Sequence, residues 1–222
     1  MKGDIYHIVN RGVNKQKIFL SDKDYERFVT NLYVFNNKNG AIRVSKKDFL
    51  KDPPEQEKIV EILKWTLMPN HYHLLIEEVV DGGVVDFVKR IGNGYTKYFN
   101  IKNNRSGYLF QNAAKIILAK NETHFTYLPI YIDLNPIDLM QADWKENGIK
   151  DSQKILEFIS SYKWASVADY IGDGNYPSII SKEKFFEVFE YTSEQYKKEL
   201  KEWVNNNKEK DREILKHVNV AG

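Results

Sequence analysis

The stretch that decides the fold is Met68-Pro69-Asn70-His71-Tyr72-His73-Leu74-Leu75-Ile76. Its apolar end favours a β-strand, and Pro69-Asn70 marks a turn before that strand. Because successive side chains of a strand point to opposite faces, His71 and His73 are expected on one face, where two imidazoles can share a metal ion. Taken alone, the pattern fits a pair of half-buried structural histidines equally well.

The sequence around this stretch predicts alternating strands and helices. Strands are expected at 4–10, 61–67, 71–78 and 108–118, with a further short strand at 41–45. A helix is expected after Ser21, which with Asp24 resembles a capping box, and another at 84–100. The order strand, helix, strand, strand, helix, strand is that of ferredoxin-like folds. We therefore predict an α+β fold, an antiparallel sheet with helices on one face.

The second half of the chain reads as helical. A helix is expected to begin near residues 121–122, and Tyr127, Tyr131 and Asn135 then share one face because they are four residues apart. Further helices are expected at 151–161, 164–171, 181–190 and from 192 to about 217.

Composition limits the class of protein. The chain has 222 residues, 42% of them hydrophobic and 14% aromatic, which is enough for a sizeable core. It has no cysteine, so disulfides, thiolate metal sites and cysteine nucleophiles are excluded. It lacks the roughly 18 to 20 apolar residues in a row that cross a membrane, and its start lacks a secretory signal, so we expect a cytoplasmic protein without a membrane partner.

The net charge of +2 conceals a local excess of positive charge. Residues 87–121 contain seven basic and no acidic residues, interleaved with aromatic ones. Cations bind phosphates and rings stack on bases, so this pattern is typical of single-stranded nucleic-acid binding, although a helix with a solvated basic face would show it too. With the loop after the first strand, the expected DNA-binding residues are Arg11, Asn14, Lys15, Lys89, Arg90, Lys97, Arg105 and Lys115.

Two histidines make an incomplete site for a divalent metal, so a third ligand is expected. Asn135 is the candidate, since a helix laid across the histidine strand would offer its amide oxygen beside the phenol of Tyr131. A phenol with a pKa of about 10 attacks poorly at pH 7 unless its proton is removed, and a metal ion assists by polarising a phosphodiester. The set predicts phosphoryl transfer through a covalent phosphotyrosine.

These residues resemble the histidine-hydrophobic-histidine motif of the REP-associated tyrosine transposases, which are related to the single-strand HUH transposases of the IS200-like group. Further matches follow in the family's order and cover about residues 1–172. They are Asn10-Arg11-Gly12-Val13-Asn14 with Ile18-Phe19, Arg105 to Gln111, Tyr131-Ile132-Asp133-Leu134-Asn135-Pro136, and Tyr162-Lys163-Trp164-Ala165-Ser166 with Asp169-Tyr170.

The resemblance implies a single-stranded DNA endonuclease and strand transferase that recognises hairpins of palindromic repeats. Tyr131 would be the nucleophile that leaves a 5′-phosphotyrosine, and His71, His73 and Asn135 would hold Mg²⁺ or Mn²⁺. It implies an HUH catalytic domain at 1–148 with a C-terminal helical extension at 149–222, acting as a monomer or a homodimer.

Several features leave alternatives open. Pro129 lies within the expected tyrosine helix, so that helix either begins near it or is kinked, and the segment at 110–115 departs from the family's pattern, which puts a DNA contact in doubt. Tyr127 is a candidate second nucleophile, and His7 is a candidate support for the site. The competing functions are a domesticated, non-catalytic hairpin-binding protein and a metal-dependent hydrolase with Glu77 and Glu78 as the nearby carboxylates.

Overall fold

The computed structural model describes residues 1–43, 53–119, 122–172 and 174–206; for residues 122–124 it describes the backbone alone. The first part of the chain contains a four-stranded sheet in the order β2-β3-β1-β4, in which every neighbouring pair is antiparallel. The elements are β1 (Ile5–Arg11), α1 (Asp22–Val34), β2 (Val60–Met68), β3 (His71–Glu78), α3 (Gly83–Lys102) and β4 (Lys115–Leu118), with a 3-10 turn at Val13–Lys15. The predicted α+β fold with its ferredoxin-like order is confirmed.

The hairpin of β2 and β3 is the one that the opening stretch predicts. Met68 pairs with His71 across a turn made of Pro69 and Asn70. The Pro69 carbonyl accepts hydrogen bonds from the backbone N–H groups of Ile18 and Phe19, at 2.8 and 3.1 Å. The turn therefore also anchors the segment that leads into α1.

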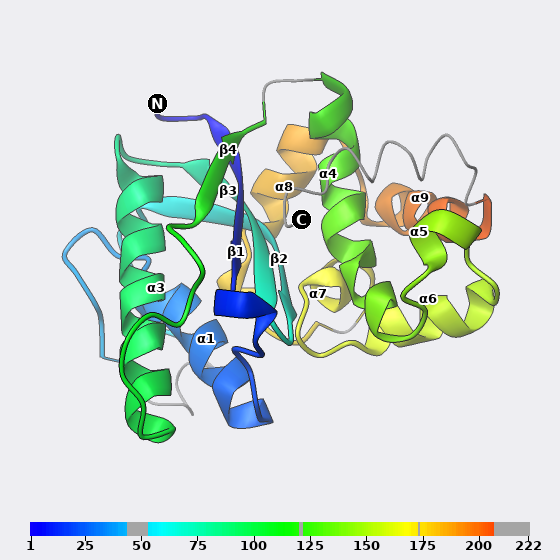
Figure 1. The fold of residues 1–222 in the computed structure, drawn as a ribbon. Coiled ribbons are helices and arrows are strands. Elements are labelled where there is room, and N and C mark those ends of the chain that lie inside the picture. The colour runs from blue at the N-terminus through cyan, green and yellow to red at the C-terminus, as the bar shows by residue number, and fades with distance from the viewer. Residues whose placement is uncertain (44–52, 120–121, 173, 207–222) are drawn as a thin grey trace.

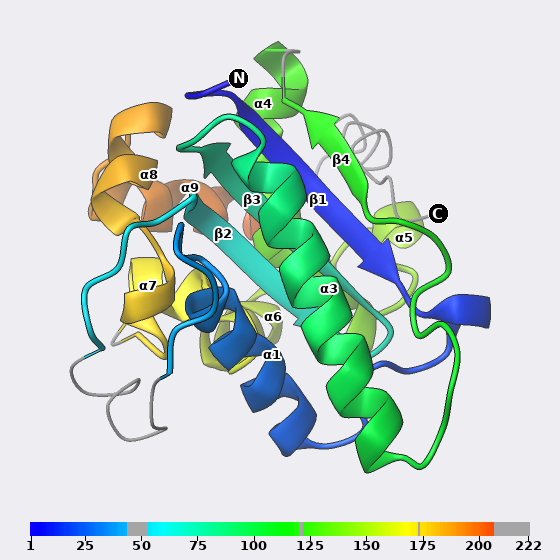
Figure 2. The same cartoon turned by 90° about the vertical axis from the view of Figure 1, so that its left-hand side faces the viewer.

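Helices α1 and α3 cover one face of the sheet, as Figure 2 shows. The capping box that begins α1 is present, with Asp24 accepting from the backbone N–H groups of Leu20 and Ser21. Lys102 at the end of α3 lies 2.5 Å from Asp24 and ties the two helices together. Both predicted helices are confirmed.

The fourth strand is shorter than predicted. We expected it at 108–118, whereas β4 covers only Lys115–Leu118, and Phe110 makes a single bridge to Gly12. Leu109 and Phe110 are consecutive and both buried, which breaks the alternation that a strand along β1 requires. The chain instead crosses the end of β1, where the Gln111 N–H donates to the Arg11 carbonyl at 2.8 Å.

The remaining helices cover the opposite face of the sheet, to the right in Figure 1. They are α4 (Glu122–Leu134), α5 (Trp144–Asn147), α6 (Ser152–Ser161), α7 (Val167–Ile171), α8 (Lys182–Phe189) and α9 (Ser193–Asn206), with a 3-10 turn at Asn135–Leu139. A second 3-10 turn, Pro177–Ile179, packs against α1. Residues 41–43 are not in a strand, and both the rest of the predicted 41–45 strand and the end of the last helix lie outside the described residues. No helix in the described chain is long and apolar enough to cross a bilayer.

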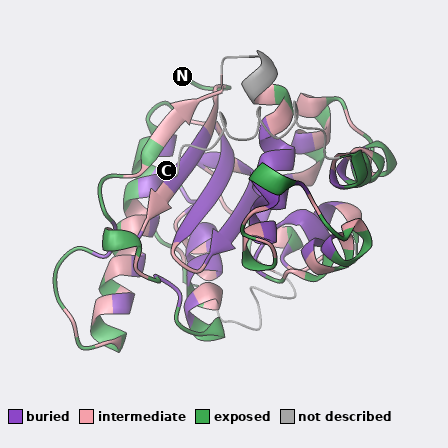
Figure 3. Ribbon diagram, turned by 45° about the vertical axis from the view of Figure 1, so that its right-hand side comes forward, coloured by how far each residue is buried: buried purple, intermediate pink, exposed green. Residues whose placement is uncertain are grey.

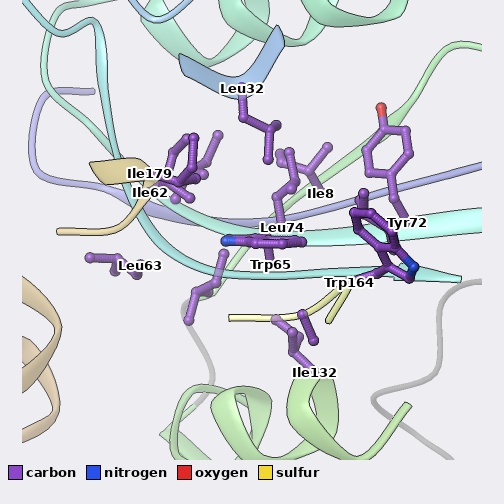
Figure 4. Packing of buried hydrophobic residues seen from close by; sticks show 14 of the residues in the cluster. Ile8, Leu32, Ile62, Leu63, Trp65, Tyr72, Leu74, Ile132, Trp164 and Ile179 are labelled. Carbon is purple, nitrogen blue, oxygen red and sulfur yellow. The ribbon is translucent and has the colours of Figure 1, made fainter. Parts of the chain in front are cut away.

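Strands β2 and β3 are buried on both faces and are mostly purple in Figure 3, whereas the edge strand β4 is intermediate to exposed. Figure 4 shows Leu32 of α1 reaching the sheet from one face and Ile132 of α4 from the other, around Trp65 and Leu74. All four side chains are buried in one continuous cluster that extends to α9. This packing holds α4 against the histidine strand.

Candidate active site

Strand alternation places the two motif histidines on the face that α4 covers. The ring centroids of His71 and His73 are 5.1 Å apart, and that of His73 is 5.4 Å from Tyr131 of α4. Tyr72, between the histidines, points the other way and packs on Phe28 of α1, with centroids 4.8 Å apart. The structure thus brings the histidine pair, His71 and His73, close to Tyr131, which follows it by about 60 residues in the sequence.

Each motif histidine has its Nδ1 held by a neighbour. His73 Nδ1 lies 2.9 Å from Nε2 of His7, and His71 Nδ1 lies 2.7 Å from Oδ1 of Asn70. The Nε2 atom of His73 is buried and has no hydrogen-bond partner among the described residues. Metal-binding histidines characteristically have one ring nitrogen fixed by such a contact and the other directed at the ion. This arrangement fits two imidazole ligands.

The third candidate ligand, Asn135, lies at the end of α4. It is buried at the start of the 3-10 turn, and its Nδ2 donates to the Tyr131 carbonyl at 2.7 Å. Asn135 interacts by side-chain hydrogen bonds with both the His71 imidazole and the Tyr131 phenol, so the amide lies between the two. The described residues include no cluster of three or more His, Cys, Asp or Glu side chains that could hold a metal ion, so the predicted set of two imidazoles and an amide stays a prediction.

Tyr131 is buried, with only 1% of the residue exposed. Burial raises its pKa above the ordinary value, and the Asp138 carboxylate acts in the same direction. Its ring meets those of His7 and His73 edge to face. In this closed arrangement the phenol stays protonated at neutral pH.

Helix α4 is fixed to the sheet by polar contacts. Pro136 has no N–H, so it cannot give the Ile132 carbonyl its α-helical hydrogen bond. The hydroxyl of Thr66 on β2 donates to that carbonyl instead, at 2.9 Å. Pro129 lies inside α4, so the helix does not begin there.

Burial also sets the charge of the histidines. It lowers the pKa of His71 to about 3, with the Arg11 and Lys145 charges acting in the same direction. The pKa of His73 is lowered well below the ordinary value, again chiefly by burial. Both imidazoles are therefore neutral at physiological pH, the form that binds metals.

Lys145 is a site residue that the sequence analysis missed. Its Nζ lies 5.9 Å from the Tyr131 ring centroid and 3.2 Å from the Asp138 carboxylate. It comes from α5, a helix of four residues whose position no periodic pattern in the sequence predicts. The site therefore has a cation on the α5 side.

The predicted DNA-binding residues fall into separate groups. Arg11 pairs with His71 across β1 and β3, and Lys115 pairs with Val9, so both lie on the histidine face. The Arg11 Nε is buried without a hydrogen-bond partner among the described residues. Asn14 and Lys15 are exposed in the loop after β1, with positive φ angles of 51° and 58°.

The basic residues of α3 and the loop after it lie elsewhere. Lys89 and Lys97 are exposed on α3, on the other side of the sheet from the histidines. Arg90 is engaged within the fold by Asp86 at 2.5 Å and by the Asn37 carbonyl at 2.6 Å. Arg105 donates to the Tyr108 carbonyl at 3.0 Å and so holds its own loop.

The other candidate residues are engaged in packing or ion pairs. Tyr127 packs edge to face on Trp203 of α9, with centroids 5.0 Å apart. Glu77 pairs with Lys184 at 3.6 Å, and Glu78 pairs with the amino terminus at 2.9 Å. These contacts give no support to Tyr127 as a second nucleophile or to the two glutamates as metal ligands.

Comparison with known proteins gives a distant structural likeness. No protein-family model matches the sequence, and no curated protein matches it. A solved structure of a REP-associated tyrosine transposase bound to a REP hairpin is similar over 76% of this chain and 79% of that chain, with 14% sequence identity and a TM-score of 0.42. A similarity of this size does not assign an activity to the present chain.

Proposed function

We propose that this protein is a metal-dependent single-stranded DNA endonuclease and strand transferase that cuts DNA at hairpins. The observation that carries the proposal is the meeting of Tyr131 with His71, His73 and Asn135 in one buried cluster. A phenol beside two neutral imidazoles and an amide oxygen is a donor set for metal-assisted phosphoryl transfer.

Tyr131 is the nucleophile in this proposal. Its Oη forms a bond to the scissile phosphorus while the bond from phosphorus to the 3′ oxygen breaks. The phenolic proton is lost to solvent, and the departing 3′ oxygen takes up a proton. The 5′-phosphotyrosine keeps the energy of the phosphodiester, so a later attack by a 3′-hydroxyl rejoins DNA without a nucleotide cofactor.

His71 and His73 would hold Mg²⁺ or Mn²⁺, with Asn135 as the third ligand. The ion, when bound, supplies positive charge that polarises a phosphate oxygen. His7 and Asn70 keep the two imidazoles oriented, because each holds the Nδ1 atom of one of them. Arg11, Lys115 and Lys145 supply cations for the flanking phosphates.

Access to Tyr131 requires α4 to move, since the side chain is almost fully buried. In this proposal the chain from residue 149 onward is a C-terminal extension, and its described helices, within 149–172 and 174–206, pack behind α4 and set how readily it moves. Tyr196 of α9 donates a hydrogen bond to Asp133 of α4 at 2.7 Å, which is a direct link between the two parts.

The test is formation of a covalent adduct. The protein is incubated with a labelled single-stranded hairpin oligonucleotide, with and without Mn²⁺ or Mg²⁺, and run on a denaturing gel. We expect a metal-dependent protein–DNA band that disappears in Tyr131→Phe and persists in Tyr127→Phe. Cleavage without a covalent band would favour the metal-dependent hydrolase.

A second candidate function is a non-catalytic hairpin-binding protein. The observation that favours it is the burial of Tyr131 and its raised pKa, both of which oppose attack on a phosphate. In that case the wild-type chain binds the hairpin with or without metal, and neither a covalent band nor a cleaved strand forms.

A further inference from the structure

A groove lies on the face of the sheet opposite Tyr131, between α3 and the segment at 108–116. It has a volume of about 630 Å³, within the range of pockets that hold small molecules. Figure 2 shows this segment running beside α3 before it enters β4. The proposed chemistry uses none of the residues that line the groove.

The lining of the groove suits a flat ring with polar edges. Val88, Leu109 and Phe110 supply apolar surface, and each is largely buried. Side-chain amides, each with a donor and an acceptor, come from Asn93, Gln111 and Asn112. Apolar walls with a few amide groups are what a nucleobase requires, since its faces stack and its edges form hydrogen bonds.

Tyr108 lines the groove and is 87% exposed. The backbone that carries it is held in place: Arg105 donates to the Tyr108 carbonyl at 3.0 Å, and Asn100 donates to the Gly107 carbonyl at 2.9 Å. The Arg105 guanidinium in turn lies 5.6 Å from the Phe99 ring centroid. A fixed backbone that presents an exposed ring is a platform on which a base can stack.

The charge around the groove complements a polyanion. Lys89 lines it, none of the described residues that line it is acidic, and the whole stretch 87–121 contains no acid. An acidic peptide would satisfy the charge but would leave the exposed ring and the row of amides without a role. Charge, ring and amides together favour a nucleic-acid strand with unpaired bases.

We propose that this groove binds unpaired bases of the DNA strand that Tyr131 cuts, with one base stacked on Tyr108. This inference rests on the proposed function, because it takes the same strand as its ligand. Asn10 lines the groove, and the next residue, Arg11, lies on the histidine face. The groove and the candidate site therefore adjoin the same end of β1, on opposite faces of the sheet.

Equilibrium binding of DNA hairpins by the full chain tests the inference. Tyr131→Phe is used throughout, so that no cleavage occurs, and anisotropy compares a labelled blunt hairpin with the same hairpin carrying unpaired thymidine extensions. We expect an added Tyr108→Ala to weaken binding of the extended hairpin about 5- to 150-fold, the effect of one lost stacking contact, and to leave the blunt hairpin unchanged. Tyr108→Trp should retain the affinity.

A control variant and a crosslinking experiment accompany this measurement. Ile101→Ala removes another highly exposed side chain of the same region, one that does not line the groove, and should change neither affinity. Photocrosslinking of 5-iododeoxyuridine in the extension should label the peptide that contains Tyr108. Equal binding of the extended hairpin by Tyr108→Ala and its parent, equal losses for both hairpins, or a crosslink elsewhere would overturn the inference. Adduct formation by the wild-type chain is measured separately, so either proposal can fail alone.

Discussion

At the scale of single residues, the histidines make stability depend on pH. The pKa of His71 is about 3 in the folded protein against 6.5 for an unperturbed histidine. Between these values the unfolded chain binds a proton that the folded chain does not, so stability falls as the pH falls from 6.5 towards 3. The slope is about 1.4 kcal/mol per pH unit for each such histidine.

We therefore predict that His71→Gln reduces this pH dependence. The free energy of unfolding in urea, measured with EDTA between pH 7 and 4.5, should fall less steeply for the variant than for the wild type. A variant slope equal to that of the wild type would show that His71 is protonated in the folded protein.

His7 carries a second prediction at this scale. Its Nε2 lies 2.9 Å from His73 Nδ1 and fixes the orientation of that ring. His7→Leu should weaken Mn²⁺ binding about 10- to 100-fold, the usual effect of losing such a supporting contact. Calorimetric titration measures this, with Tyr6→Phe on the same strand as the control. Unchanged affinity would show that the contact from His7 does not support metal binding.

The sequence predicts part of the site's geometry and misses the rest for physical reasons. The shared face of His71 and His73 follows from strand alternation, and the proximity of Asn135 to Tyr131 follows from the helical repeat. Lys145 could not be predicted, because its approach depends on the path of a short turn and of α5. Local periodicity contains no information on such a path.

At the scale of elements, Thr66 decides how firmly α4 is attached to the sheet. Thr66→Val removes the donor to the Ile132 carbonyl and leaves that buried group unpaired, so we expect a loss of about 1 to 3 kcal/mol in unfolding free energy. Thr66→Ser should keep most of the stability. Thr30→Val is the matched control, since that hydroxyl bonds a carbonyl of its own helix. Equal effects at the two positions would contradict this role.

The elements themselves are largely predictable, except where tertiary contacts override the local pattern. The strands of the hairpin and the helices α1 and α3 follow from periodicity and capping. The strand predicted at 108–118 forms only at Lys115–Leu118, because Leu109 and Phe110 are both buried as the chain crosses the end of β1. Apolar content indicates burial there, but it does not reveal the direction of the chain.

At the scale of the whole molecule, a buried ion pair joins the sheet to the helices behind it. Lys64 of β2 lies 2.6 Å from Asp133 of α4, and both side chains are fully buried. Tyr196 of α9 bonds the same carboxylate, and the Lys64 Nζ lies 4.1 Å from the Tyr196 ring centroid. Burial lowers the pKa of Lys64 to about 8, so the lysine is still charged at pH 7.

Removing one partner of this pair leaves the other charge buried without compensation. We predict that Lys64→Met costs about 3 to 5 kcal/mol of unfolding free energy, and that Lys64→Met with Asp133→Leu recovers much of the loss. Urea unfolding of the two single variants and the double variant gives the coupling free energy between the two side chains. Additive losses would show that the two side chains do not act as a pair.

That the later helices cover the second face of the sheet could not be predicted from their sequences. An amphipathic pattern shows that a helix buries one side, but not which surface it is buried against. Lys64 and Asp133 illustrate this. Charged residues are ordinarily expected at the surface, whereas both side chains of this pair are fully buried.

The central claim is that Tyr131 itself becomes bonded to DNA, and peptide mass spectrometry of the adduct tests it most directly. After incubation with a hairpin oligonucleotide and Mn²⁺, nuclease and trypsin digestion leaves a nucleotide on the peptide that spans residues 121–145, which contains both Tyr127 and Tyr131. Fragmentation should place the phosphonucleotide on Tyr131. A nucleotide on Tyr127, or an unmodified peptide from protein that has cleaved its substrate, would contradict the claim.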